Sequence, residues 1–179
     1  MKRKPILTLL TLALAATSFS QTPEILSIRK YREENTAAIM KEYVDFLSIP
    51  NTANDAAGLK SNTEFIMRMM EQRGIQKVQL LEANTPNTPP VVYGEVNTPG
   101  ATQTLIFYAH YDGQPVNPAQ WAKGLQPFQP KLYTNAIDKN GEHIPFPSDN
   151  KSFLPDYRIY GSSAMAPCTR VARNKLYLG

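Results

Sequence analysis

The residues whose types and spacing could support chemistry are His110 and Asp112, in the stretch LIFYAHYDGQP at positions 105–115. In an extended backbone, side chains two positions apart point the same way and lie about 6.5 Å apart, so we expect this imidazole and this carboxylate to share a side. A neutral imidazole can bind zinc through one nitrogen while a carboxylate holds the other nitrogen and fixes the ring. The spacing alone is compatible with a metal ligand and its orienting carboxylate, or with a structural hydrogen-bonded pair.

The segment that leads into His110 has the composition of a buried strand. Residues 104–109 are almost all apolar or aromatic on both faces, which is typical of a central strand covered on both sides. In open α/β sheets, functional sites lie just beyond the carboxyl ends of the strands. We therefore expect His110 at the carboxyl end of a central strand, where Gly113 lets the backbone turn away.

Two helices are predicted before this strand. Thr22-Pro23 is a favourable helix start, and apolar residues then recur at helical spacing until Ile49-Pro50 ends the helix. The pattern Ser61-x-x-Glu64 predicts a capping box for a second helix, and Gly74 is a natural stop for it.

Further strands are predicted around Val78 and Leu80 and over residues 91–96, with turns rich in proline, asparagine and threonine between them. Asn140-Gly141 predicts a hairpin turn between residues 132–136 and 143–146. Helices followed by strands of this kind indicate an α/β fold.

The first twenty residues have the layout of a secretory signal peptide, with a positive start, an apolar run and small residues before a cleavage point at Gln21. The alternative is a short membrane anchor, but the apolar run falls well short of the ~20 residues that span a bilayer. We therefore expect export to the periplasm or the outside of the cell, with no stable membrane association after cleavage.

The charge balance argues against nucleic acid as a partner. The chain has 19 basic and 15 acidic residues, and three of the basic ones, Lys2, Arg3 and Lys4, belong to the expected signal peptide, which leaves 16. No basic stripe with interleaved aromatic residues remains. The single cysteine, Cys168, allows no disulfide within the chain.

A wider pattern adds to these local signals. FLSIPNTA, MMEQRGI, VVYGEV, LIFYAHYDGQP, then Trp121 with Pro127-Phe128, and RIYG follow one another in this order. This ordered set resembles the N-terminal part of the two-zinc exopeptidase family, which includes carnosinase-type dipeptidases, glutamate carboxypeptidases, acetylornithine deacetylase and succinyl-diaminopimelate desuccinylase. The resemblance covers about residues 24–161, and the run His-Tyr-Asp-Gly-Gln-Pro is most similar to the dipeptidase branch.

The resemblance implies an incomplete, N-terminal portion of a zinc-exopeptidase catalytic domain, in which helices pack on a mixed, largely parallel sheet. It implies that His110 is a zinc ligand and that Asp112 is the catalytic carboxylate that orients the active-site histidine. Two zinc ions that share a water or hydroxide are implied as well. The substrate implied is a dipeptide or a small N-acyl amino acid, and a homodimer is compatible with the intact family.

After Gly161 the sequence departs from the family pattern, which continues with an arginine, small residues and an aspartate that bridges both metals. Here the sequence reads SSAMAPCTRVARNKLYLG, and no acidic residue follows Asp156. The bridging aspartate and the later metal ligands are therefore missing from this sequence. A premature stop or a frameshift just after Gly161 would produce this change. We expect residues 1–20 to be the signal peptide, 21–161 a partial catalytic domain and 162–179 an atypical, poorly ordered tail.

Two other functions stay open beside a zinc metallopeptidase. One is a catalytically inactive fragment or pseudoenzyme that keeps the family's fold, and the other is an exported binding module in which His110 and Asp112 are structural. We expect His143 to be a surface residue of a turn-rich insertion. Trp121 and Phe128 are expected to pack beneath the entrance of the site.

Overall fold

The structure, a computed structural model, describes residues 22–86 and 88–161. The chain divides into two compact units, residues 1–35 and residues 36–179. The expected signal peptide (1–20) and the expected tail (162–179) lie outside the described residues. No helix of the described ranges is both long enough and apolar enough to cross a membrane.

The first unit contains helix α2 (Pro23–Glu34), which starts where the sequence predicts, with Thr22 as the N-cap and proline at the first position. The helix ends at Asn35, whose side-chain amide donates to the carbonyl of Tyr31 at 2.8 Å. An asparagine side chain that competes for a backbone carbonyl in this way favours a helix end. The prediction of one helix that continues to Ile49-Pro50 is therefore wrong, because a separate helix, α3 (Thr36–Leu47), begins just after Asn35.

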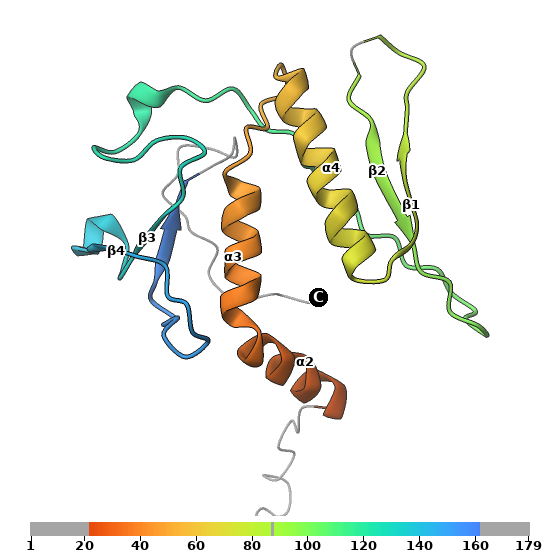
Figure 1. Cartoon of the computed structure of the whole chain (residues 1–179), viewed down its shortest axis with the longest axis horizontal. Coiled ribbons are helices and arrows are strands. Elements are labelled where there is room, and N and C mark those ends of the chain that lie inside the picture. Colours follow the sequence, from red (N-terminus) through yellow and green to blue (C-terminus); the bar gives the residue numbers. More distant parts are fainter. Residues whose placement is uncertain (1–21, 87, 162–179) are drawn as a thin grey trace, which may run out of the picture. The chain divides into compact units, whose positions relative to one another are not determined.

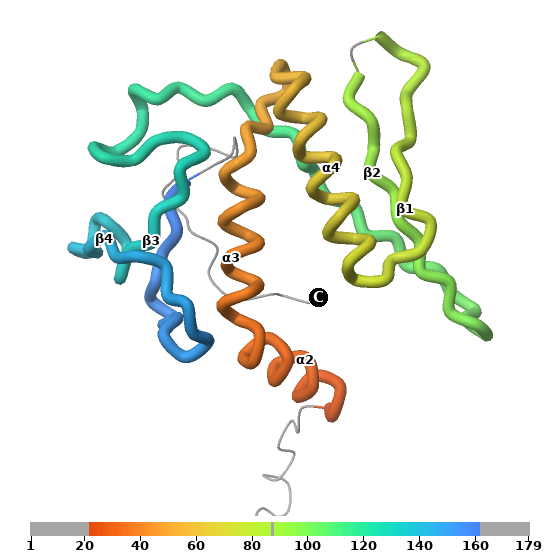
Figure 2. The backbone as a smooth tube through the Cα atoms, in the orientation of Figure 1, coloured from red at the N-terminus to blue at the C-terminus, as the bar shows by residue number. Residues whose placement is uncertain are grey.

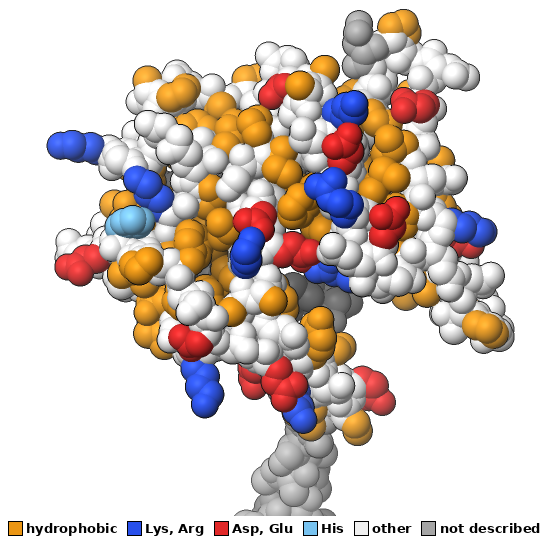
Figure 3. All heavy atoms as spheres, viewed as in Figure 1, with side chains coloured by type: hydrophobic (Ala, Val, Ile, Leu, Met, Phe, Trp, Pro, Cys, Tyr) orange, Lys and Arg blue, Asp and Glu red, His pale blue; other side chains and the backbone are white. Residues whose placement is uncertain are grey.

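Helix α4 (Ala56–Gln72) follows α3 in the second unit (Figure 1). Aromatic and charged side chains join the two helices. The rings of Phe46 and Phe65 stack with their centroids 5.5 Å apart. Arg73 also forms an ion pair with Glu42, with 3.1 Å between Nη1 and Oε1. Figure 3 shows acidic and basic side chains interspersed with apolar ones on the face that it draws, without a large patch of one sign.

Helix α4 begins five residues before the predicted capping box. Asp55 is its N-cap and accepts a hydrogen bond from the backbone N–H of Gly58 at 2.8 Å. A carboxylate is a strong N-cap because it also meets the positive end of the helix dipole. Ser61 instead lies inside the helix and donates to the carbonyl of Ala57, so the prediction of a start at Ser61 is wrong. The predicted stop is confirmed, since Gly74 follows the last turn with φ of +71°.

Strands β1 (Gln76–Leu81) and β2 (Val91–Glu95) form an antiparallel pair that packs against α4, and Figure 2 traces both strands beside that helix. Both strands were predicted. A side chain at Gly94 would bring its first carbon within 2.7 Å of Ile75 and 3.1 Å of the Met70 sulfur. The glycine therefore permits the close approach of β2 to the end of the helix.

A second sheet has the order β4-β3-β5 and is also antiparallel. Its strands are β3 (Lys131–Tyr133), β4 (His143–Ile144) and β5 (Arg158–Tyr160), and the short 3-10 helices η1 (Pro118–Gln120) and η2 (Ile137–Lys139) lie in the connections. The predicted hairpin is confirmed, with shorter strands than predicted, because β3 and β4 pair antiparallel and Asn140 adopts φ of +58° in the connection between them. Leu132, 1% exposed, and Tyr160, 5% exposed, form the core of this sheet.

The predicted central strand at residues 104–109 is absent from both of these sheets. The segment forms no helix, strand, turn or bend and pairs with no strand of the described residues, and Ile106 and Phe107 are each 89% exposed. An apolar stretch becomes a buried strand only when other strands pair with it, and no described residue does so. The described part of the chain is thus a mixture of helices and small antiparallel sheets. Its one parallel contact is an isolated bridge between Thr52 and Gly113.

Candidate functional site

The chain immediately after His110 is fixed to the segment that precedes α4. The backbone N–H of Gly113 donates to the carbonyl of Asn51 at 2.7 Å, and the N–H of Ala53 donates to the carbonyl of Gly113 at 2.8 Å. The side-chain amide of Asn51 donates to the carbonyl of Tyr111 at 2.9 Å. These three bonds hold residues 111–113 against residues 51–53.

The bonds between residues 111–113 and residues 51–53 form an anchor for the chain after His110. Helix α4 holds residues 51–53 in place through Asn62, which is 1% exposed. Its side-chain amide donates to the carbonyl of Pro50 and to that of Gly58, both at 2.8 Å. Gly58 is required at this approach, because a first side-chain carbon there would lie 2.4 Å from the Pro50 carbonyl oxygen. The first turns of α4 therefore set the position of the segment that holds residues 111–113.

Tyr111 forms a second tether, toward the start of β2. Its hydroxyl donates to the carbonyl of Pro90 at 2.5 Å. Burial of the phenol raises the pKa of Tyr111, and the negative charges of Asp112 and Glu82 raise it further. The phenol is therefore held in its neutral, donating form.

His110 and Asp112 lie on the same side of the extended chain, as the two-residue spacing predicts. The distance between His110 Nδ1 and Asp112 Oδ1 is 3.1 Å. Tyr108, two residues earlier, shares this side, and its hydroxyl lies 3.3 Å from His110 Nε2. When Nδ1 carries the proton and donates to Asp112, Nε2 presents its lone pair, which accepts from Tyr108. Nε2 is therefore the ring atom that could bind a metal ion.

The pair is open to water. The side chains of His110 and Asp112 are 66% and 41% exposed. A pair this exposed contributes at most about 1 kcal/mol to stability. Tyr108 is 78% exposed, so its hydroxyl can leave Nε2 without disturbing a packed core. The arrangement thus orients the imidazole ring but does not enclose it.

The donor set fits one metal ligand and not a complete zinc site. Catalytic zinc takes about three protein ligands and a water. Within residues 22–86 and 88–161 no three His, Cys, Asp or Glu side chains gather closely enough to hold an ion. Here one imidazole has a carboxylate on its Nδ1 and the Tyr108 hydroxyl on its Nε2.

The second histidine, His143, lies on β4 and is exposed, as expected. Its ring lies 5.6 Å from that of Tyr133. Trp121 follows η1, and both Trp121 and Phe128 are half-buried. Neither His143 nor the two aromatic residues is in a hydrogen bond or ring contact with His110 or Asp112 among the described contacts.

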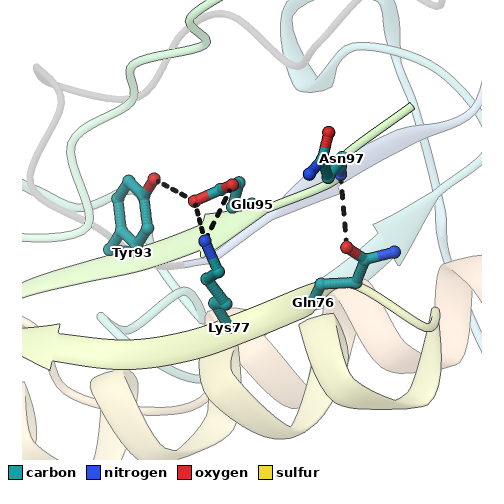
Figure 4. Close-up of polar contacts among 5 residues, drawn as sticks. All are labelled: Gln76, Lys77, Tyr93, Glu95 and Asn97. Atoms are coloured by element: carbon teal, nitrogen blue, oxygen red, sulfur yellow. Dashed lines mark hydrogen bonds and ion pairs between the residues drawn. The ribbon is translucent and has the colours of Figure 1, made fainter. Parts of the chain in front are cut away.

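A separate polar cluster on β1 and β2 joins Lys77, Tyr93 and Glu95 (Figure 4). Lys77 Nζ lies 3.0 and 3.1 Å from the two carboxylate oxygens of Glu95, and the Tyr93 hydroxyl donates to the same carboxylate at 2.9 Å. The hydrogen bond from Lys77 lowers the pKa of Glu95, and the bond to Glu95 raises the pKa of Tyr93. These three side chains meet one another's hydrogen-bonding needs where the register of the strand pair is irregular. The cluster therefore links β1 to β2 at that point.

Sequence reasoning missed the residues that position the site, chiefly Asn51, Asn62 and Tyr111. Asn62 had a signal of its own, because it falls on the apolar side of α4, three residues after Leu59 and three before Phe65. A polar amide on such a stripe indicates a buried hydrogen-bonding role. Asn51 and Tyr111 carry no comparable pattern.

No family model matches this chain, and neither a curated protein nor a solved structure matches it.

Proposed function

We propose that residues 24–161 are the N-terminal part of the catalytic domain of an exported two-zinc exopeptidase of the dipeptidase type. Its reaction would be hydrolysis of the amide bond of a dipeptide or a short N-acyl amino acid. The observation that carries the proposal is the pairing of His110 Nδ1 with Asp112 Oδ1 at 3.1 Å, which leaves the Nε2 lone pair, contacted by the Tyr108 hydroxyl at 3.3 Å, as the atom that would bind a metal once that hydroxyl moves away. The largely parallel sheet of such a domain is part of the proposal.

The roles of the two residues follow from this geometry. A carboxylate that accepts the Nδ1 proton fixes the tautomer and the ring orientation, and it raises the basicity of Nε2 toward a metal. His110 is thus the proposed ligand, and Asp112 is the residue that positions it. Hydrogen bonds that join Gly113 and Tyr111 to Asn51 hold the backbone on both sides of Asp112.

The proposal places residues 104–109 in the interior of a larger sheet. Their composition is that of a strand with both faces covered, whereas here both faces are exposed. Neighbouring strands and the remaining zinc ligands would come from outside the described residues. Zinc, when bound by a full set of ligands, supplies an activated water and polarises the substrate carbonyl.

A second candidate is a binding module in which the pair is structural. The observation in its favour is that Tyr108, His110 and Asp112 satisfy one another without a metal. The two candidates differ in whether His110 binds zinc when zinc is added to the protein.

The test is equilibrium zinc binding by the 179-residue chain, with dipeptide hydrolysis measured beside it. We expect weak binding of at most one zinc, lost in His110→Ala and retained in His143→Ala, the matched control. Asp112→Asn should weaken binding by about 10- to 100-fold. The chain alone should not turn over dipeptides, because one ligand does not make a catalytic site.

Two outcomes would contradict this account in different ways. Zinc binding that is unchanged in His110→Ala would remove the proposed ligand and favour the structural role. Two equivalents of zinc, with turnover that disappears in His110→Ala, would show that the chain holds a complete site.

Export is a separate part of the proposal. N-terminal sequencing of protein collected outside the cytoplasm should find a chain that begins at or near Gln21. Retention of Met1 in that protein would contradict the signal peptide.

A further inference from the structure

The connection between β3 and β4 contains the only Asn-Gly pair of the sequence, Asn140-Gly141. In such a pair the backbone nitrogen of the glycine can attack the side-chain carbonyl carbon of the asparagine, because glycine has no side chain to block the approach. A bond forms between the glycine nitrogen and Cγ, the bond between Cγ and Nδ2 breaks, and the proton of the glycine nitrogen leaves with Nδ2 as ammonia. Water then opens the resulting succinimide ring at either carbonyl and leaves an aspartate or an isoaspartate.

The turn itself requires both residues of this pair. Asn140 adopts φ of +58°, a conformation that asparagine tolerates better than most other residues do. At Gly141 a first side-chain carbon would clash with the carbonyl oxygen of Asn135 and would lie 3.0 Å from that of Ala136. The residues that build the turn are therefore the same residues that make the modification chemically possible.

The closed turn holds the nitrogen that would attack. The backbone N–H of Gly141 donates to the carbonyl of Ala136 at 3.0 Å. This nitrogen must lose its proton and approach the Asn140 side chain before it can react, so the hydrogen bond has to break first. Two further bonds close the turn, since the N–H of Thr134 donates to the carbonyl of Glu142 at 2.9 Å and the N–H of Glu142 donates to the Thr134 hydroxyl at 3.0 Å.

We propose that Asn140 is a site of spontaneous deamidation and that opening of the turn between β3 and β4 controls its rate. Asn140 is exposed, so water reaches the site. The bond from Gly141 to Ala136 keeps the reaction slow while the turn is closed. Turns open locally without unfolding of the whole chain. When opening and closing are fast, the rate of a slow reaction follows the equilibrium population of the open form.

The two products differ in their effect on the sheet. Aspartate keeps the length of the main chain and is tolerated at positive φ. Isoaspartate adds a carbon atom to the main chain within the turn, so the bonds that close the turn no longer fit. Strand β4 lies at the edge of its sheet and pairs with β3. We therefore expect the isoaspartate form to lose this pairing and the variant Asn140→Asp to keep it.

This proposal does not depend on zinc or on the proposed peptidase, so its test is separate from that of the function. The full chain is incubated at neutral pH, folded or unfolded in urea, and the deamidation of each asparagine is followed by peptide mass mapping. We expect Asn140 to be modified at least about tenfold more slowly in the folded chain, because the open turn is then a minor population. Absence of modification at Asn140 in the unfolded chain would overturn the site. Equal rates in the two states would overturn the control by the turn.

A substitution in the turn separates its opening from global unfolding. Thr134→Val removes the hydroxyl that accepts from Glu142, so the turn should open more often and Asn140 should deamidate faster. Thr102→Val is the matched control, since Thr102 is exposed and lies outside the β4-β3-β5 sheet, and it should leave the rate unchanged. In the unchanged chain, low concentrations of urea should raise the rate at Asn140 together with amide exchange at Gly141. A rate at Asn140 that stays constant in Thr134→Val, or while exchange at Gly141 rises, would overturn the proposal.

Discussion

Residues 104–112 and residues 131–144 each contain an apolar, β-type stretch and one of the chain's two histidines, but their surroundings are opposite. Leu132 on β3 is 1% exposed, whereas Ile106 is 89% exposed. Strand β3 has β4 on one side and β5 on the other, while residues 104–109 have no strand on either side among the described residues. The difference lies in the neighbours and not in the local sequence.

The two regions also differ in where the chain goes after each apolar stretch. The chain after β3 turns at Asn140, in the left-handed conformation, and returns directly as β4. The chain after residue 109 instead docks on residues 51–53 at Gly113 and continues away. Burial of the apolar side chains therefore follows strand pairing, whereas both histidines are exposed.

The largest predicted effect is the difference between an alanine substitution at the buried Leu132 and one at the exposed Ile106. Leu132→Ala should lower the free energy of unfolding by about 2–5 kcal/mol, because it leaves a cavity in a packed sheet. Ile106→Ala should change it by no more than about 0.5 kcal/mol, because the side chain is in water. Denaturant unfolding of both variants checks this, and equal losses would show that residues 104–109 are packed in solution.

The next largest effect concerns Asn62, which holds the segment at residues 50–53 to which residues 111–113 are bonded. Asn62→Ala removes two hydrogen bonds from a buried amide and leaves the Pro50 carbonyl without its donor, so we expect a loss of about 1–3 kcal/mol. Ser61→Ala, on the exposed neighbour, is the control and should cost less. Amide exchange at Gly113 should accelerate in Asn62→Ala. An unchanged rate would show that α4 does not hold residues 111–113.

A smaller effect is expected from pH, through Tyr111 in the metal-free protein. Its folded pKa is raised, chiefly by burial and then by Asp112, so the neutral phenol is favoured in the folded state. This stabilisation is complete below the unfolded pKa of about 10 and is lost as pH rises through the folded pKa. Stability measured against pH in the alkaline range should fall less in Tyr111→Phe than in the unchanged chain. Identical alkaline profiles would show that the folded protein does not raise the pKa of this phenol.

The smallest effect is expected at the polar cluster on β1 and β2. Lys77→Ala removes a surface ion pair in which the Lys77 side chain is 65% exposed, so the loss should stay below about 1 kcal/mol and shrink further in high salt. Thermal unfolding at low and high salt measures it. A loss as large as that of Leu132→Ala would mean that ion pairs, and not strand packing, hold the strands.

Elements defined by local chemistry could be predicted from the sequence. The start at Thr22-Pro23, the stop at Gly74, the turn at Asn140 and the shared side of His110 and Asp112 all depend on residues within a few positions of each other. Some helix ends were still predicted wrongly. Helix α4 begins after Asp55 and not at the capping box predicted at Ser61. The apolar spacing predicted one helix where Asn35 separates α2 from α3.

Features that depend on distant residues could not be predicted in this way. Whether residues 104–109 are buried depends on strands elsewhere in the sequence, which a local pattern does not contain. The anchor of the site likewise joins Asn51 to Tyr111, sixty positions apart. The sequence therefore indicated the two residues of the candidate site but not the segments that hold them.

The most direct test of the account is a zinc titration followed at the imidazole nitrogens by ¹⁵N nuclear magnetic resonance, because it compares the two histidines in one sample. We predict that the Nε2 signal of His110 shifts as zinc is added and that its Nδ1 keeps the signal of a protonated nitrogen bonded to Asp112. Both nitrogens of His143 should stay unchanged, and Asp112→Asn should require more zinc for the same shift. An unchanged His110, or equal shifts at both histidines, would contradict the assignment of His110 as a metal ligand.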